Sequence, residues 1–248
     1  MKFSEMPYAR PDMDSLFKQL DNLTAQLQDA PDAQAQLEIF DAKDKLMSRF
    51  NTLSSICSIR NTVDTRDKFY EEEQEYLDGQ YPLVSEKVQA FNKVLVTSPF
   101  RRELEEKLGA LLFTNIELEL KSFSPEIVPL LQEENRLSTE YQKLYASARI
   151  EFMGKTVTIA QLGPYKQDPD RTVRKAAIEA EGGFFDQHRQ ELDELYDKLV
   201  KNRTEQAKKL GFENYVPLGF IRMGRNCYTP EDLSSFRSQV VRDLVPLT

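Results

Sequence analysis

The stretch DMDSLFKQLDNLTAQLQDAP, residues 12–31, carries the pattern that decides the fold class. Asp12 stands where a side-chain oxygen can cap the free backbone N–H groups at the start of a helix. Pro31 cannot continue a helix and separates this segment from the next. The apolar residues between them recur at intervals of four, three and four, which places them on one helical face. They are Leu16, Leu20, Leu23 and Leu27. The stretch therefore predicts an amphipathic helix.

The same spacing continues through the middle of the chain. It predicts a second helix over residues 32–61, packed on the first, and a third over residues 65–95 that Thr65 caps and Pro82 kinks. Two Ser-Pro steps follow, at Ser98-Pro99 and Ser124-Pro125. Each puts a hydroxyl at the N-cap and a proline at the first helical position. We expect each step to open a further helix.

Near residue 150 the apolar period changes from about 3.6 to 2. The alternation around Met153-Gly154 predicts a small β-hairpin near residues 150–159. A helix over residues 168–210, expected to be the longest, should bend at Gly182-Gly183 and end at Gly211.

An irregular stretch at residues 213–228 comes next. Thr229-Pro230, with Asp232 three residues beyond the cap, predicts the start of a last helix. That helix reaches Thr248 without a glycine cap or a polar tail. The predicted fold class is all-α, a multi-helical lobe of long antiparallel helices with one small β-hairpin.

Charge and composition exclude several kinds of protein. The chain has 248 residues with 33 basic and 41 acidic side chains, a net charge of −8 that argues against a nucleic-acid partner. It shows neither a signal peptide nor an apolar run long enough to span a membrane, so we expect a cytoplasmic protein. Cys57 and Cys227 lie too far apart for a metal knuckle and are expected to be buried, reduced thiols. The acidic run at residues 71–75 is expected to be a solvated helix surface.

Histidine occurs once, at His188. A zinc site with two imidazoles and the H-E-x-x-H motif are therefore excluded from this polypeptide. Asp186 and Glu191 could tune His188 for proton transfer, and Cys57 could pair with it, but a surface histidine and a buried cysteine are the simpler interpretations. The phosphate-binding glycine motifs and G-x-S-x-G are also missing. The sequence predicts no catalytic, cofactor-binding or metal-binding residue.

The second half of the chain concentrates residue types that a merely structural helix does not require. They occur at Gln161–Tyr165, Asp168–Ala177, Leu199–Arg203, Ala207, Leu210–Tyr215, Arg222–Arg225 and Tyr228. In their order and spacing these segments, with Pro11–Met13 near the start, resemble the oligoendopeptidase F branch of the thimet-type zinc metallopeptidases. The likeness covers most of the chain and is strongest from about residue 150 onward.

The resemblance implies a nearly all-α enzyme whose N-terminal helical lobe and C-terminal catalytic lobe enclose a cleft for short peptides. The family's H-E-x-x-H zinc motif lies downstream of the part represented here, so this chain would be an inactive N-terminal fragment. It would contain an N-terminal helical domain at residues 1–122 and, at residues 123–248, the start of the peptidase domain, truncated before the zinc motif. Zinc would bind the full-length enzyme and not this segment.

The expected partners are short peptides and the C-terminal catalytic lobe, with this segment forming one wall of the cleft. Tyr215, Arg222, Arg225 and Tyr228 are the residues to test first for contacts with peptide or with that lobe. Pairing of Arg222 and Arg225 with carboxylates is at least as good an interpretation. A competing hypothesis is an all-α scaffold or interaction protein without catalytic activity, which binds a partner helix along an apolar groove.

Overall fold

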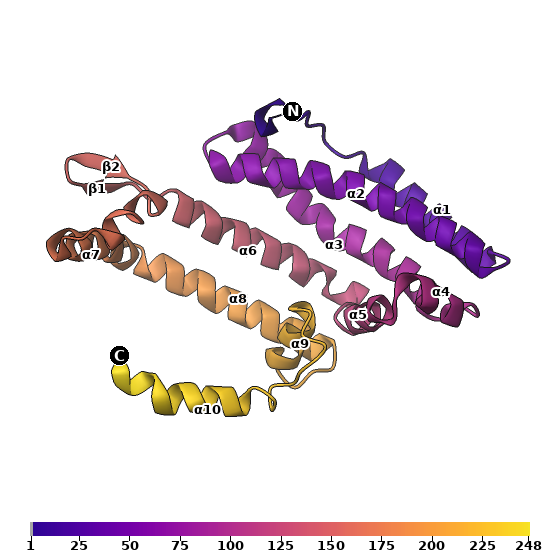
Figure 1. Ribbon diagram of the computed structural model, residues 1–248. Coiled ribbons are helices and arrows are strands. Elements are labelled where there is room, and N and C mark those ends of the chain that lie inside the picture. The colour runs from indigo at the N-terminus through magenta and orange to yellow at the C-terminus, as the bar shows by residue number, and fades with distance from the viewer. Residues whose placement is uncertain (1) are drawn as a thin grey trace.

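The computed structural model describes residues 2–248 and is almost entirely helical (Figure 1). Its helices are α1 (Met13–Asp29), α2 (Ala33–Val63), α3 (Lys68–Val96), α4 (Arg101–Leu108), α5 (Ala110–Lys121), α6 (Val128–Ala146), α7 (Arg171–Gln187), α8 (Arg189–Lys209), α9 (Tyr215–Arg222) and α10 (Ser234–Asp243). One antiparallel hairpin joins β1 (Ile150–Phe152) to β2 (Lys155–Val157). The predicted class, all-α with one small hairpin, is confirmed. Within the described residues, none of these helices has the length and apolar character needed to cross a bilayer.

The first three helices form the N-terminal core. α1 and α2 pack on each other and on α3, with Leu20, Phe50 and Leu77 buried between them. The predicted cap at Asp12 is present, and Asp32 caps α2 in the same way, because each accepts a hydrogen bond from the backbone N–H three residues further on, at 3.0 and 2.8 Å. The first helix therefore starts where its sequence indicates, and its leucine face packs inward as predicted.

A proline marks the joint between this core and the second half of the chain. α3 runs on past Pro82, which has no N–H, so the carbonyl of Asp78 four residues earlier lacks its usual helical donor. Asn135 on α6 supplies a donor instead, with Nδ2 2.9 Å from Asp78 O. One turn earlier on α6, Gln132 Nε2 lies 2.8 Å from the carbonyl oxygen of Gly79. The proline thus frees the Asp78 carbonyl as an acceptor, and the two hydrogen bonds from α6 to α3 fix where α6 docks.

The second half of the chain is built on α6. This helix lies along α8, and Leu137, Leu144 and Leu195 are buried between the two. A separate apolar cluster joins the hairpin to α7 and includes Phe152 and Phe184. Together α3, α6 and α8 form a layer from which α9 and α10 follow toward the C-terminus (Figure 1).

Two helices that the sequence predicts as continuous are divided. The helix expected from Ser98 is two helices, α4 and α5, because Gly109 between them takes φ +88° and interrupts the helical backbone. The helix expected over residues 168–210 is divided into α7 and α8 at His188, whose backbone leaves the helical conformation at φ −102° and ψ 13°. Gly182-Gly183, the expected bending point, lies inside α7.

Several local predictions are wrong in detail. The third helix is capped by Asp67 rather than Thr65, because Asp67 Oδ1 accepts from the N–H groups two and three residues further on. The stretch 213–228, expected to be irregular, contains α9. Cys57 is buried as expected, whereas Cys227 is exposed on the segment after α9.

The helices expected from Ser98, Ser124 and Thr229 begin later than predicted. α4, α6 and α10 start at residues 101, 128 and 234, each after a short turn. At the last of these turns the expected capping bonds are present, since the N–H of Thr229 donates to Asp232 Oδ2 at 2.7 Å and Thr229 Oγ1 accepts from the N–H of Asp232 at 3.3 Å. The hydrogen bonds were predicted correctly, but they close a turn before the helix rather than its first turn.

Candidate functional site

A partly buried carboxylate, that of Glu134, fixes the position of α9. Glu134 on α6 accepts hydrogen bonds from Arg203 Nε at 2.6 Å and Gln206 Nε2 at 2.8 Å, both on α8, and from Arg222 Nη1 at 3.2 Å, at the end of α9. Burial alone would raise the pKa of Glu134, but the donors on Gln206 and Arg203 and the charge of Arg222 outweigh it and lower that pKa. Glu134 is therefore ionised and ties three helices together.

Further amide groups extend this network. Arg222 Nη2 lies 2.5 Å from Gln206 Oε1, and Gln206 Nε2 lies 2.5 Å from Asn202 Oδ1. Asn202 in turn donates to the backbone carbonyl of Leu130 at 3.0 Å. Because each polar group has a partner, the network holds α9 in one orientation against α6 and α8.

The ring of Tyr215 lies near two guanidinium groups of this network. The guanidinium carbons of Arg203 and Arg222 lie 5.8 and 5.9 Å from the centre of that ring, within the range of cation–π attraction. Asn214 caps α9 by accepting a hydrogen bond from the N–H of Val216 at 2.9 Å, so Tyr215 is the first residue of the helix. Tyr215 is half-buried, so part of the residue remains exposed to solvent.

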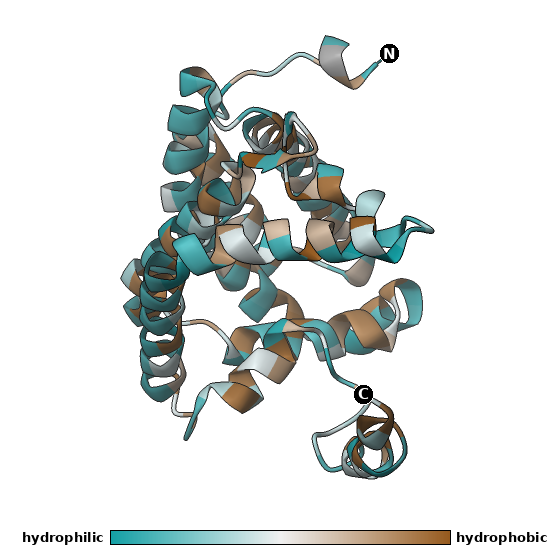
Figure 2. Cartoon of the chain, turned by 90° about the vertical axis from the view of Figure 1, so that its left-hand side faces the viewer, coloured by the Kyte–Doolittle hydropathy of each residue, from teal (hydrophilic) through white to brown (hydrophobic). Residues whose placement is uncertain are grey.

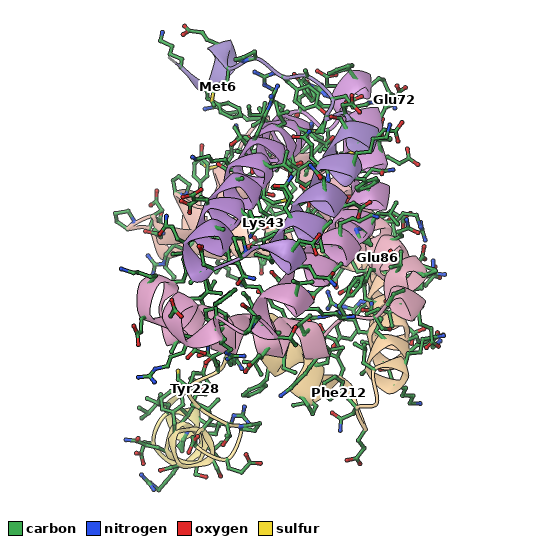
Figure 3. The ribbon with its side chains drawn as sticks, turned by 90° about the vertical axis from the view of Figure 1, so that its right-hand side faces the viewer. Met6, Lys43, Glu72, Glu86, Phe212 and Tyr228 are labelled. Atoms are coloured by element: carbon green, nitrogen blue, oxygen red, sulfur yellow. The ribbon has the colours of Figure 1, made fainter. Side chains whose placement is uncertain are left out.

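A third arginine, Arg225, lies near two aromatic rings just after α9. The guanidinium of Arg225 is 4.8 Å from the centre of the Phe220 ring and 6.0 Å from that of Tyr228. Among residues 2–248, no carboxylate lies within 4.0 Å of Arg225, in contrast to Arg222. The chain turns here at Gly224, which takes φ +64°, and Asn226 is hydrogen-bonded to Asn115 on α5. Tyr228 lies on the side of the molecule toward α10 (Figure 3).

The four residues chosen from the sequence for testing thus fall into two pairs on one short segment. Arg222 contacts Tyr215 and pairs with a carboxylate, and Arg225 contacts Tyr228 and does not. Arg222 therefore pairs with a carboxylate, as one of the two interpretations expects. Arg225 has no carboxylate partner in the described chain.

The remaining candidates do not form a catalytic group. His188 lies between α7 and α8, with Nδ1 3.2 Å from Glu191 Oε2 and its ring 4.6 Å from that of Phe184. Cys57 belongs to the core of the first three helices and is fully buried. Asp186 pairs with Arg189 at 2.5 Å. The imidazole and the thiol therefore belong to different parts of the fold.

Two members of the acidic run at residues 71–75 are tertiary contacts, which corrects the prediction of a solvated surface. Glu73 is buried and accepts hydrogen bonds from the hydroxyl of Tyr8 at 2.6 Å and from Arg10 Nε at 2.9 Å. Glu71 is paired with Lys68 and Lys143, and these two ammonium groups lower its pKa to about 2. The run therefore fastens the N-terminal segment and α6 to α3.

The residues present do not fit a zinc ion. A protein zinc site needs three or four nitrogen, sulfur or oxygen ligands around one point. No group of three histidine, cysteine, aspartate or glutamate side chains within residues 2–248 is arranged to hold a metal. The Glu134 network positions α9, and no catalytic step can be assigned to it.

Comparison with known proteins gives the family. Residues 3–123 match the family described as the peptidase M3 N-terminal domain. Similar solved structures include PZ peptidase A with an inhibitor (46% identity, TM-score 0.94, 99% of this chain and 44% of that one) and a candidate oligoendopeptidase F (44% identity, TM-score 0.95, 100% and 44%). A third is a candidate oligoendopeptidase F from Bacillus anthracis strain Ames (40% identity, TM-score 0.94, 100% and 45%). No curated protein matches the chain.

The chain spans less than half of the length of these relatives, and the likeness covers practically all of its own residues. The sequence resemblance to oligoendopeptidase F is thereby confirmed, and the chain belongs to the M3 peptidases, with residues 3–123 matching that family's N-terminal domain.

Proposed function

We propose that the chain is the N-terminal portion of a zinc-dependent oligopeptidase that hydrolyses internal bonds of short peptides. In this proposal residues 2–248 form one wall of the substrate cleft, and a C-terminal lobe contributes H-E-x-x-H and the zinc ion, which would activate the attacking water. The observation that carries the proposal is the likeness over the whole chain to peptidase structures more than twice as long. The cytoplasmic location expected from the sequence stays a prediction.

The role left to this segment is to bind and orient peptide. Tyr215 offers an aromatic face that the Glu134 network holds in place, and such a face can contact the side chains of an extended peptide at a low cost in conformational entropy. The net charge of −8 favours the approach of basic peptides. These properties affect which peptides bind, and bond cleavage is assigned to the other lobe.

The test compares two polypeptides, the 248-residue chain and the product of its complete reading frame. Zinc content and the cleavage of a quenched fluorescent peptide are measured for both. We expect stoichiometric zinc and turnover only in the longer product. Stoichiometric zinc in the 248-residue chain, or a complete reading frame that lacks H-E-x-x-H, would overturn the proposal.

A non-catalytic interaction protein is the competing candidate, and the exposed apolar residues of α10 are the observation that favours it. It predicts neither zinc nor turnover in the longer product. The same two measurements therefore separate the candidates.

A further inference from the structure

The helix α10 has no partner in the described part of the chain. None of its residues is buried, and it makes its main contacts with the short turn Val245–Leu247 that follows it. Figure 1 and Figure 2 both show α10 standing apart from the helical body. A helix of ten residues is marginally stable by itself in water, so packing against another surface would be needed to hold it.

One side of α10 is apolar and faces solvent. The apolar residues on it recur every three or four positions, as in a helix that buries one face. What we call the α10 face consists of Phe236 and Val240 on the helix, Leu233 and Leu244 at its two ends, and Leu247 in the turn that follows. Phe236, Leu244 and Leu247 are 64%, 55% and 81% exposed, although side chains of this kind usually lie in a core or an interface.

The charge of this region differs from that of the rest of the chain. Residues 215–248 hold four basic and three acidic side chains, a net charge of +1, which leaves −9 for residues 1–214. Arg225, just before α10, has no carboxylate within 4.0 Å in the described chain, although its guanidinium has five N–H donors. An apolar surface with a carboxylate beside it would complement both features.

We infer that the α10 face and Arg225 form a docking site within a longer polypeptide. The docked part would be the C-terminal region that the relatives have and this chain lacks. That part would cover the α10 face with apolar side chains and pair a carboxylate with Arg225. The inference rests on the proposed function, because the relatives' length supplies the occupant: this chain covers only 44–45% of them. A second copy of the chain is the alternative occupant, and the experiment tells the two apart.

Hydrogen exchange of the α10 amides is the direct test, measured in the 248-residue chain and in the product of the complete reading frame. In the shorter chain we expect residues 234–243 to exchange at nearly unprotected rates while the core of α8 stays protected. In the longer product the same amides should exchange at least about a hundredfold more slowly.

Two pairs of variants of the longer product show whether the contact is specific. Leu244→Ser should restore fast exchange in α10, whereas Ile178→Ser, at a site on α7 with nearly the same exposure (56% against 55%), should not. Arg225→Gln should speed exchange in α10 at low salt and have less effect at high salt, because screening already weakens the ion pair. Arg189→Gln, which removes an arginine on α8 whose side chain is 72% exposed and paired with Asp186, is its control.

Four results would overturn the inference: protection of α10 in the monomeric short chain, protection that appears only as the short chain dimerises, no protection in the complete product, or equal effects of Leu244→Ser and Ile178→Ser. Peptide cleavage by the longer product is scored separately. Cleavage with an unprotected α10 would contradict the docking inference and leave the proposed function standing. A protected α10 without cleavage would support the docking inference and contradict the proposed function.

Discussion

The joint at Pro82 makes a prediction that depends on two residues at once. Asn135 donates to the carbonyl of Asp78, which lacks a helical donor only because residue 82 is proline. The substitution Asn135→Leu keeps a side chain of similar size and removes the amide N–H donor. Asp78 is 9% exposed, so water can replace that donor only poorly. A hydrogen bond lost to an otherwise unpaired acceptor costs about 1–3 kcal/mol, and we expect about 1.5 kcal/mol here.

The same substitution should cost less when the proline is removed. In a Pro82→Ala background the alanine N–H can donate to Asp78 O, so Asn135→Leu should lower the free energy of unfolding by only about 0.5 kcal/mol. The coupling between the two sites would then be about 1 kcal/mol. Urea unfolding followed by circular dichroism measures all four proteins of the cycle.

Gln132 provides the matched control for this cycle. It donates to the carbonyl of Gly79, whose usual helical donor, the N–H of Leu83, does not depend on residue 82. Gln132→Leu should therefore cost the same with proline or alanine at that position. If Asn135→Leu also costs the same in both backgrounds, the explanation of the joint is wrong.

Three further predictions concern other parts of the fold. Glu134→Gln leaves two partly buried guanidinium groups without their carboxylate and should cost about 2 kcal/mol in urea unfolding, so a cost below about 0.5 kcal/mol would contradict the role of the network. Gly109→Ala should lower the free energy of unfolding by about 1–3 kcal/mol because φ is +88° there, whereas Gly182→Ala inside α7 should raise it by about 0.5–1 kcal/mol. Similar effects at both sites would refute the role of Gly109 in ending α4. The pKa of Glu73 is lowered, mainly by its hydrogen bond from Arg10. Its contribution to stability is therefore present above the ordinary pKa of about 4.3 and is lost as pH falls through the lower folded value. Glu73→Gln should make the free energy of unfolding depend less on pH at acid pH, and an unchanged dependence would count against the contact.

Local signals predicted the beginnings of the first two helices, and competing signals explain where prediction failed. Asp12 and Asp32 each precede a clear 3.6-residue period, so cap and period agree. At Gly109 the apolar period continues on both sides of the break, and a glycine inside such a pattern does not reveal its positive φ. His188 gives no breaking signal at all, although the backbone leaves the helix there.

The candidate site was predictable in residue type and not in partners. Tyr215 and Arg225 belong to a segment in which aromatic and basic residues gather, and that pattern is visible in the sequence. Glu134, which fixes α9, lies about 80 positions earlier in the sequence, and only the packing of α6 on α8 brings it there. Arg10 and Glu73 are likewise 63 positions apart, and only the packing of the N-terminal segment on α3 brings them together.

The most direct test of the central claim, that this chain forms part of a peptide-binding cleft, is the KM of the complete product for a short peptide. Tyr215→Ala should raise KM severalfold with kcat and zinc content nearly unchanged, because it removes an aromatic contact and no catalytic group. Tyr141→Ala, at a tyrosine on α6 that is 45% exposed, serves as the control and should leave KM unchanged. An unchanged KM for Tyr215→Ala, or an equal rise for both variants, would contradict the account.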